Sequence, residues 1–407
     1  MDRREFLKAA GLSTCLFLPG ISAWAKTGIV PTENKLVVIF LRGAADGLSL
    51  VVPYSDPRYY SVRPKIAIPK PGQANGSLAL NSDFALHPSL APLMPLWQNK
   101  SLSFVINSGS PDPTRSHFDA QDYMESGIPG NKVVSTGWMN RLLGQLPNNN
   151  SPVRAINVGT TTPRILEGPV AVATYAPSTR KRKAPMDNVA VARAFESIYG
   201  ERQDELGKAF HEGMEAKATI SAKLDSEMTA ADQGALPANK FAGFGKQLGK
   251  LIHEEPKVQV AFVDLGGFDT HVNQGSSQGQ LANHLNVLGS GLSELATALG
   301  PSYNKTTVIV MSEFGRTVKE NGNGGTDHGH GNVMWLMGGR VKGGVIHGHF
   351  DGLADRALYE GRDMPVHTDF REVLGSVVGE HMQLSSAQLA QVFPNFAIPA
   401  GNPYLAT

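Results

Sequence analysis

The chain has 407 residues, of which 41% are hydrophobic and 18% charged, and its formal net charge at pH 7 is +1. This balance supplies enough apolar side chains for a large core and argues against global disorder. The chain carries no clustered basic excess of the kind found in nucleic-acid binders, so we expect no nucleic-acid partner.

Residues 1–25 resemble an export signal. Arg3 and Arg4 open the run RREFLKAAG, a modestly apolar stretch follows, and an A-x-A cleavage pattern ends at Ala25. Paired arginines followed by Glu-Phe-Leu-Lys are typical of a twin-arginine signal, which is an address for the export machinery rather than an anchor. An ordinary secretory signal is the alternative. We therefore expect cleavage near Ala25, a periplasmic or secreted protein and no stable membrane anchor.

Residues 26–35 are predicted to form a linker and residues 36–407 a single α/β domain. Short, continuous apolar runs of the kind that form strands buried on both faces of a parallel sheet recur along the domain. They lie at 35–41, 101–107, 151–159, 257–265, 306–311 and 332–337.

Helical patterns fall between these runs. Leucines recur at three- and four-residue spacing over 279–299, which predicts an amphipathic helix. With the strands before and after it, this helix forms a β-α-β unit whose strands are parallel. Two further patterns, at 202–230 and from Phe241 to Leu251, predict a cap-like helical insertion near 202–254. We expect it to lie against one face of the sheet or to cover the mouth of a site.

Polar and ionisable side chains cluster next to the predicted strands. They are Arg42 and Asp46 after 35–41, Arg115 and Ser116 after 101–107, Asp269 and His271 after 257–265, Glu313 and Arg316 after 306–311, and Asp327, His328 and His330 before 332–337. In open parallel sheets, ligands bind beyond the carboxyl ends of the strands. We therefore expect these side chains to share one site.

Several of these residues also fit purely structural roles. Asp46 precedes a glycine, which is common turn chemistry. Ser116 fits the N-cap of a helix, a role compatible with catalysis because helix N-termini favour anions. Glu313 and Arg316 could form a structural ion pair.

The histidine-containing segments favour ligand or acid–base chemistry. Asp269 and His271 directly after a buried strand are typical of a ligand pair, although a surface turn is the alternative. Asp327, His328 and His330 lie within four residues, flanked by glycines, and suit metal binding or acid–base work.

The segments FLRGAADGLSLVVPY, SHFDAQDYMESG, VDLGGFDTH, MSEFGRT and GGTDHGHGNVMWLMGGRVKGG, in this order, resemble those of the bacterial DUF1501 proteins. The resemblance covers nearly the whole chain. It implies a fold similar to the alkaline phosphatase and sulfatase superfamily, with three α/β/α layers and a mostly parallel central sheet.

The resemblance also implies roles for individual residues. Ser116 would be the nucleophile, and the metal ligands would be Asp46, Asp269, His271, Glu313, and His328 or His330. Phe314 stands where the superfamily has another ligand, and Asp327 or the neighbouring histidine could replace it. The cysteine that conventional sulfatases convert to formylglycine is absent.

Two functions follow from this resemblance. The first is hydrolysis or transfer of a small anionic ester, phosphate or sulfate, with one or two divalent ions (zinc, calcium or manganese) activating Ser116 or a water. Arg42, Arg115 or Arg316 would clamp the ester's anionic group. The second is a non-catalytic binding or assembly protein on a degenerate scaffold, which the Phe314 substitution favours.

Overall fold

A computed structural model describes most of the predicted domain. It covers residues 33–147, 153–159, 161–175, 204, 235–237 and 241–406. The predicted export signal, and most of the predicted insertion before residue 241, lie outside the described residues. Within the described part of the chain, no helix combines the length and apolar character needed to cross a membrane.

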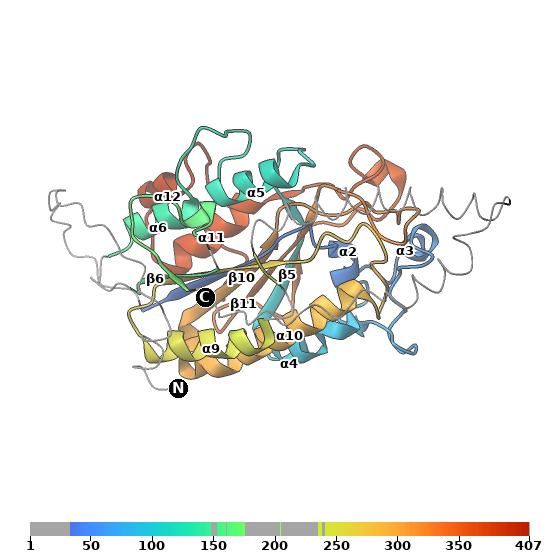
Figure 1. Ribbon diagram of the computed structural model, residues 1–407, viewed down its shortest axis with the longest axis horizontal. Coiled ribbons are helices and arrows are strands. Elements are labelled where there is room, and N and C mark those ends of the chain that lie inside the picture. The colour runs from blue at the N-terminus through green and yellow to red at the C-terminus, as the bar shows by residue number, and fades with distance from the viewer. Residues whose placement is uncertain are drawn as a thin grey trace.

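A central sheet runs through the molecule (Figure 1). Its strand order is β12-β5-β11-β10-β1-β9-β6-β7, with β13 beside β5 and β8 beside β9. The strands are β1 (Lys35–Leu41), β5 (Leu102–Gly109), β6 (Ala155–Val158), β7 (Ala173–Tyr175), β8 (Leu236–Pro237), β9 (Val260–Gly266), β10 (Thr306–Ser312), β11 (Asn332–Gly338), β12 (Ile346–His347) and β13 (Thr368–Asp369).

The sheet is mostly parallel, as the sequence predicts. β1 lies between β9 and β10 and pairs with both in parallel register. The exception is β11, which is antiparallel to both of its neighbours, β10 and β5. Every residue of β1, β9, β10 and β11 is buried, which explains why these strands are continuous apolar runs without alternation.

Helices cover both faces of the sheet and complete the three layers (Figure 1). One face carries η1 (Pro88–Leu93), α4 (Met94–Gln98), α9 (Phe241–Glu254) and α10 (Gln280–Leu299). The other carries α5 (His117–Ser126), α6 (Trp138–Gln145), α11 (Phe370–His381) and α12 (Ser386–Val392).

Smaller elements complete the described part of the fold. They are α2 (Gly47–Leu50), α3 (Pro57–Val62), the three-stranded sheet of β2 (Val51–Val52), β4 (Ala85–Leu86) and β3 (Leu78–Ala79), and the short helices η2 (Arg164–Leu166), η4 (Gly300–Lys305) and η5 (Asp355–Ala357).

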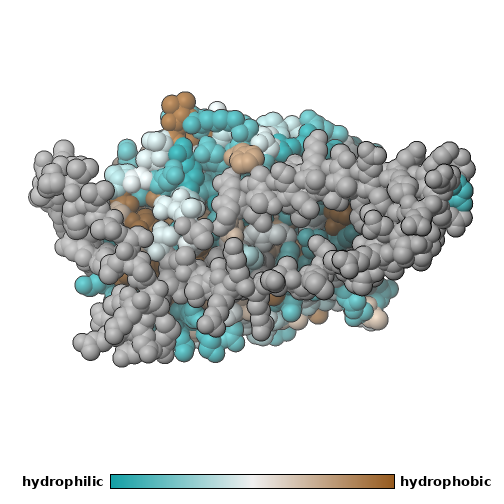
Figure 2. Space-filling view, viewed as in Figure 1, coloured by the Kyte–Doolittle hydropathy of each residue, from teal (hydrophilic) through white to brown (hydrophobic). Residues whose placement is uncertain are grey.

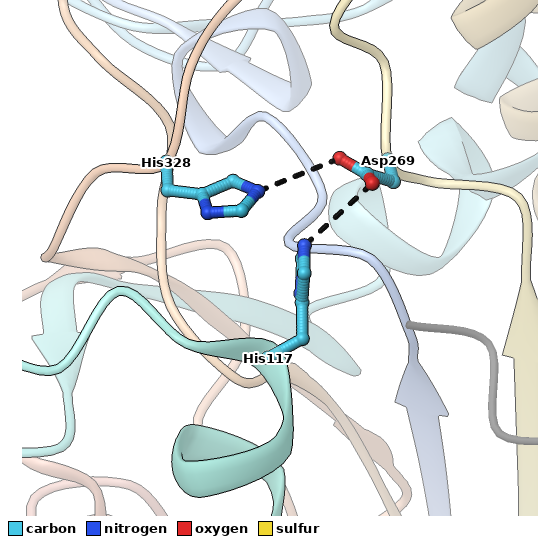
Figure 3. Close-up of side chains that lie close together, drawn as sticks. All are labelled: His117, Asp269 and His328. Atoms are coloured by element: carbon cyan, nitrogen blue, oxygen red, sulfur yellow. Dashed lines mark ion pairs between the residues drawn. The ribbon is translucent and has the colours of Figure 1, made fainter. Parts of the chain in front are cut away.

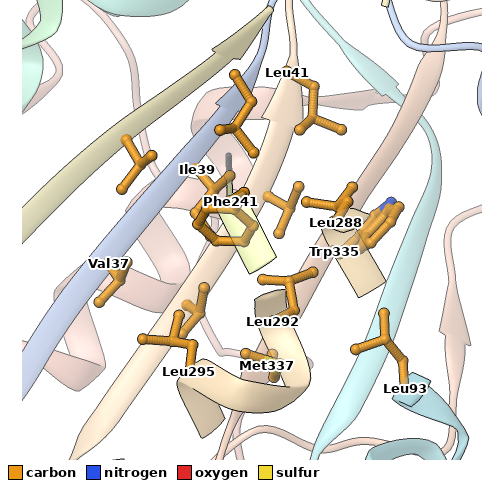
Figure 4. Packing of buried hydrophobic residues seen from close by; sticks show 14 of the residues in the cluster. Val37, Ile39, Leu41, Leu93, Phe241, Leu288, Leu292, Leu295, Trp335 and Met337 are labelled. Carbon is orange, nitrogen blue, oxygen red and sulfur yellow. The ribbon is translucent and has the colours of Figure 1, made fainter. Parts of the chain in front are cut away.

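One apolar cluster fixes α9 and α10 to the sheet. Leu288 and Leu292 of α10 pack with Val37 and Ile39 of β1 and with Trp335 of β11 (Figure 4). Burying an aliphatic side chain of this kind contributes about 1.5–3 kcal/mol. The leucine stripe predicted over residues 279–299 therefore faces the sheet.

A second cluster holds the opposite helical layer. Leu36 and Val38, which alternate with the first set along β1, pack with Trp138 of α6, Val377 of α11 and Val392 of α12. Successive strand residues point to opposite faces, so β1 alone contributes to both cores.

The helix predicted from Phe241 to Leu251 is α9, and it belongs to the layer beneath the sheet. α9 lies directly on α10: a Cβ added at Gly245 would be 2.2 Å from the Gly291 carbonyl oxygen, and one at Gly249 would be 2.7 Å from that of Leu295. This part of the predicted insertion thus lies against a face of the sheet, the first of the two arrangements expected for it.

Candidate functional site

Three side chains from distant segments meet at one edge of the sheet: His117, Asp269 and His328 (Figure 3). His117 is the first residue of α5, and Asp269 lies in the loop after β9. His328 lies in the loop before β11. Because β11 runs antiparallel to β10, the residues before it lie at the edge where β10 ends.

The backbone fixes the loop that carries His328. Beyond the strand ends, the chain after β10 pairs with the chain before β11. The Gly329 N–H donates to the Gly315 carbonyl at 2.8 Å, and the Thr317 N–H donates to the Asp327 carbonyl at 2.9 Å. A Cβ at Gly315 would lie 1.9 Å from the Gly331 carbonyl oxygen, so only glycine fits there. The glycines of this segment thus allow the close backbone approach that places His328.

The three side chains are spaced as ligands of one metal ion. Asp269 Oδ2 lies 3.6 Å from His117 Nε2, and Asp269 Oδ1 lies 3.8 Å from His328 Nε2. One ligand atom from each residue lies within 4.8 Å of the others. Ligand atoms that sit about 2 Å from a shared ion have separations of this order. His117 and Asp269 are buried and His328 is half-buried.

Two atoms of this group have no hydrogen-bond partner although they are buried: His117 Nε2 and Asp269 Oδ2. Buried polar atoms are almost always satisfied, and an orphan pair that faces each other calls for an explanation. A cation between them would satisfy both, so the residues present fit a metal ion.

Each imidazole is held by an acceptor on its other nitrogen. His117 Nδ1 donates to Glu313 Oε1 at 2.8 Å, and His328 Nδ1 donates to the Arg115 carbonyl at 2.8 Å. These bonds leave each Nε2 directed toward Asp269. Such outer partners orient ligating histidines in metal sites and raise their basicity.

Electrostatics keep the carboxylates of the site ionised. Burial alone would raise the pKa of Asp269, but the nearby imidazoles of His117, His271 and His328 and the charge of Arg316 hold it well below its usual range. Burial likewise opposes ionisation of Glu313, yet hydrogen bonding to His117 lowers its pKa to about 2.

The pKa of His117 is shifted in the opposite direction, upward. Burial favours the neutral ring, but the carboxylates of Asp269 and Glu313 outweigh it and raise the pKa of His117 to about 9. Burial lowers the pKa of His328. The site is therefore a negatively charged position that attracts either a proton or a metal ion.

His271 adjoins the group, as the sequence predicts. Its Nε2 lies 2.9 Å from His328 Nε2 and 3.1 Å from Asp269 Oδ1. Its Nδ1 lies 3.3 Å from Asp327 Oδ1. The half-exposed Asp327 thus holds His271 from behind, and the structure does not place it among the central ligand atoms, where the sequence leads us to expect it.

Glu313 also lies one layer further out than predicted. Its Oε1 accepts from His117, Gln121 and the Gly43 N–H, and its Oε2 accepts from the Ser312 hydroxyl at 2.9 Å. With both oxygens occupied, Glu313 orients His117 and does not join the central group.

Asp46 is held away from the group by an ion pair. Its two oxygens accept from the guanidinium of Arg63 at 2.6 and 3.0 Å, and Ser49 and Gln274 each donate to Oδ2 at 2.7 Å. Although burial opposes it, Arg63 keeps the pKa of Asp46 low. The sequence predicts a metal ligand here, whereas the structure gives a saturated buried ion pair.

Arg42 does not serve as the predicted clamp for an anion. It is buried, and its guanidinium pairs with Asp264 at 2.8 Å and with Glu125 at 2.9 Å. Arg316 is also buried, and its guanidinium contacts Asp269. Of the predicted clamps only Arg115 reaches solvent, with 32% of its side chain exposed, and it pairs with Glu360 and Asp363.

Ser116 is the N-cap of α5, the structural role that its sequence context favours. Its hydroxyl accepts from the Asp119 N–H at 3.5 Å. Its catalytic role stays a prediction, and its place directly before His117 keeps it next to the site.

The structure distinguishes His328 from His330, which the sequence leaves open. The His330 ring packs against that of Tyr359 in a tilted arrangement, with centroids 4.6 Å apart, and burial lowers the pKa of His330. Only His328 of the two belongs to the group that could hold a metal.

His117 is the residue that the sequence prediction missed. It follows the capping Ser116, and its ring packs 5.0 Å from that of Phe314. The signal was its position at the start of a helix after a buried strand, where a side chain points toward the strand ends. Phe314 also packs 5.2 Å from His328, so the ring that replaces a ligand forms a wall of the site.

The sequence matches the family described as "Protein of unknown function (DUF1501)" over residues 33–393. No curated protein matches it. Among solved structures, it is similar to the C-terminal periplasmic domain of EcEptC from Escherichia coli in complex with Zn, with 9% identity, 76% of this chain and 73% of that chain covered, and a TM-score of 0.34.

Two other solved structures show a comparable likeness. The lipoteichoic acid synthase LtaP from Listeria monocytogenes has 7% identity, with 92% and 74% of the two chains covered and a TM-score of 0.36. BT1596, a 2-O GAG sulfatase, has 11% identity, with 91% and 72% covered and a TM-score of 0.35. Likenesses this distant assign no activity to the chain.

Proposed function

Because this chain belongs to the DUF1501 family, whose description assigns no activity, we propose a function from the geometry of the site itself. The protein is an exported metal-dependent hydrolase that acts on a small phosphate or sulfate ester. His117, Asp269 and His328 hold one divalent ion, and His271 supplies a further ligand nitrogen.

The observation that carries this proposal is the orphan pair, His117 Nε2 and Asp269 Oδ2, buried without hydrogen-bond partners. These two atoms face each other at 3.6 Å, so a cation held between them would satisfy both. The outer acceptors Glu313 and the Arg115 carbonyl support the same conclusion, because they direct both Nε2 atoms inward.

The donor set favours zinc or manganese over calcium. Two or three imidazole nitrogens and one carboxylate suit a transition-metal ion, whereas calcium takes oxygen ligands. When bound, such an ion lowers the pKa of a water and polarises an ester oxygen.

The chain's own residues supply binding and orientation. His271 and His328 are the partly exposed members, with 12% and 15% of their side chains accessible, so a substrate approaches from their side. Arg115, whose carbonyl holds His328, carries the one predicted clamp guanidinium that reaches solvent. An anionic ester that lies against His328 would displace the carboxylate of the exposed Glu360 from the guanidinium of Arg115.

The direct test uses residues 26–407, elemental analysis and a panel of phosphate and sulfate esters. We expect about one zinc or manganese per chain and turnover of at least one ester class. His328→Ala should lose both metal and turnover, whereas His330→Ala, in the same loop but outside the group, should keep both. Metal-free protein with unchanged turnover would contradict the proposal.

The nucleophile is tested in the same assay. If Ser116 attacks the ester, Ser116→Ala abolishes turnover and leaves the metal content unchanged. If a water attacks, the variant keeps turnover and loses only a helix cap, which costs about 1 kcal/mol of stability.

A second candidate function is capture of a ligand or partner without turnover. Phe314, packed against both His117 and His328, favours it because an aromatic wall leaves room for fewer ligands. It predicts metal content and ester binding by wild type and no product with any ester in the panel.

Export is proposed from the sequence alone. Replacing Arg3 and Arg4 together by lysine should retain the full-length precursor in the cytoplasm if the twin-arginine machinery is the partner. Unchanged export of this variant would indicate an ordinary secretory signal.

A further inference from the structure

We infer that Arg316 is a built-in cation that occupies the place of a second ion beside Asp269, so that the centre takes one divalent ion and not two. The inference rests on the proposed metal centre and deepens it. It assigns Arg316 a positioning role in place of the anion clamp expected from the sequence.

The first observation is that the two carboxylate oxygens of Asp269 have different surroundings. Its Oδ1 contacts the Arg316 guanidinium, and its Oδ2 has no hydrogen bond and faces His117. One carboxylate oxygen is thus neutralised by a fixed charge while the other stays available. A carboxylate that bridges two ions with one oxygen on each would need both oxygens free.

The second observation is the cage around the guanidinium. Arg316 is completely buried, and its nitrogens donate to four backbone carbonyls in addition to the carboxylate. The carbonyls are those of Gly43, Ala44, Phe268 and Thr326. Carbonyl and carboxylate oxygens are the ligands that hard cations prefer, so this cage would suit an ion if the guanidinium were absent.

The backbone is specifically shaped for this cage. Gly43 and Ala44 both have positive φ, at 101° and 56°, which is rare for alanine. A Cβ at Gly43 would lie 2.5 Å from the Asp269 N. The two left-handed residues present successive carbonyls to Arg316, and the glycine lets the chain after β1 approach Asp269.

The third observation concerns His271. Arg316 Nη1 lies 3.5 Å from His271 Nε2, the atom that also approaches His328 and Asp269. A second dication on the Arg316 side of Asp269, near Oδ1, would lie beside the guanidinium in a buried setting, where like charges repel strongly. The fixed charge therefore leaves room for one ion, on the side of Asp269 that faces His117.

Counting ions on the wild-type chain tests the inference without any substitution. The metal-free mature protein is titrated with zinc by calorimetry, and bound zinc is measured by elemental analysis after dialysis. We expect saturation at one ion per chain. Two ions per chain would overturn the inference and leave the metal centre intact, whereas no bound ion would remove the proposed metal centre itself.

Arg316→Ala then opens the cage. We expect this variant to bind one calcium ion that the wild type does not bind. We also expect its zinc dissociation constant to differ from the wild-type value by at least about tenfold. Zinc affinity within twofold of wild type, together with no calcium binding, would contradict the positioning role. Guanidinium ion at non-denaturing concentration should restore the wild-type zinc affinity, and potassium at equal ionic strength should not.

A matched control separates positioning from folding. Arg63→Ala removes another fully buried arginine that pairs with an aspartate, so it should lower stability comparably and leave zinc affinity unchanged. If Arg316→Ala does not fold, Arg316→Lys keeps the charge and should still bind a single zinc ion. A second zinc ion in that variant would overturn the inference.

Discussion

Asp46 and Asp269 follow neighbouring strands, β1 and β9, and both are buried beside an arginine, yet their surroundings differ in one decisive respect. Arg63, Ser49 and Gln274 saturate both oxygens of Asp46. Arg316 and His271 meet only one oxygen of Asp269, and the other faces His117 Nε2, which likewise has no hydrogen bond.

A position at a strand end therefore does not by itself make a carboxylate a metal ligand. A saturated carboxylate contributes to stability and has no free lone pair to offer. An unsaturated one is costly to keep buried unless something binds it. We therefore expect substitutions at the first centre to change folding, and substitutions at the second to change metal binding.

Asp46→Asn should have the largest effect of the substitutions, and the effect should be on folding stability. Removing one partner of a buried ion pair leaves the other charge uncompensated, so we expect the free energy of unfolding to fall by about 3–5 kcal/mol. Denaturant titration of the metal-free protein measures this. The exposed Asp83→Asn serves as control and should stay within about 0.5 kcal/mol of wild type.

His87, which lies near Asp46, gives the pH dependence of the same region. Burial lowers the pKa of His87 from 6.5 to about 4, so between these pH values the unfolded chain binds a proton that the folded chain does not. The contribution of His87 to the free energy of unfolding is fully present above pH 6.5. It is lost progressively, by about 3 kcal/mol in all, as the pH falls to about 4.

His87→Asn keeps an acceptor for the Ser89 N–H, which His87 Nδ1 accepts at 3.0 Å. The loss of stability between pH 6.5 and 4 should be smaller in this variant by a comparable amount, as denaturant titrations at several pH values would show. Parallel curves for variant and wild type would contradict the assignment.

Stabilisation by bound zinc tests the second centre, around Asp269. Zinc at one hundred times its dissociation constant should stabilise the wild type by about 2.7 kcal/mol. Asp46→Asn should retain this increment, although its baseline is lower, and His328→Ala should lose it. Thermal or denaturant unfolding with and without zinc gives the increment. Retention of the full increment by His328→Ala would remove His328 from the ligands.

The smallest effect is expected at Asp327, which holds His271 from a half-exposed position with 54% of its side chain accessible. Asp327→Asn should weaken zinc binding by about tenfold, the lower end of the range for outer partners of ligands. Competition with a chromogenic chelator measures this change. Asp351→Asn, which removes a carboxylate that bonds His349 and His367, is the matched control and should leave zinc affinity unchanged.

Much of the fold could be predicted because its signals are local. The strand predicted at 35–41 is β1, and the strands predicted at 306–311 and 332–337 end one residue later, as β10 and β11. Strands buried on both faces must be apolar throughout, so each run is visible without knowledge of its neighbours. The leucine stripe of α10 follows equally from the helical period.

The site was predicted only in part. Asp269, His271 and the segment from Asp327 to His330 stand out in the sequence because polar residues beside buried strands are unusual, but the sequence leaves His328 and His330 undistinguished. His117 was missed because it follows a serine that explains the helix start by itself. The resemblance implies that Asp46 binds metal, and the sequence gives no signal of its pairing with Arg63, 17 residues later.

The sequence by itself determined where the chain is buried, which segments become strands and which ionisable side chains stand at their ends, because each depends on neighbours along the chain. Only the tertiary structure decided which of those side chains meet. The antiparallel direction of β11 brings His328 to Asp269, and the loop after β1 gives Arg316 two of the four carbonyls of its cage. Pairings between distant segments depend on geometry that local sequence patterns do not encode.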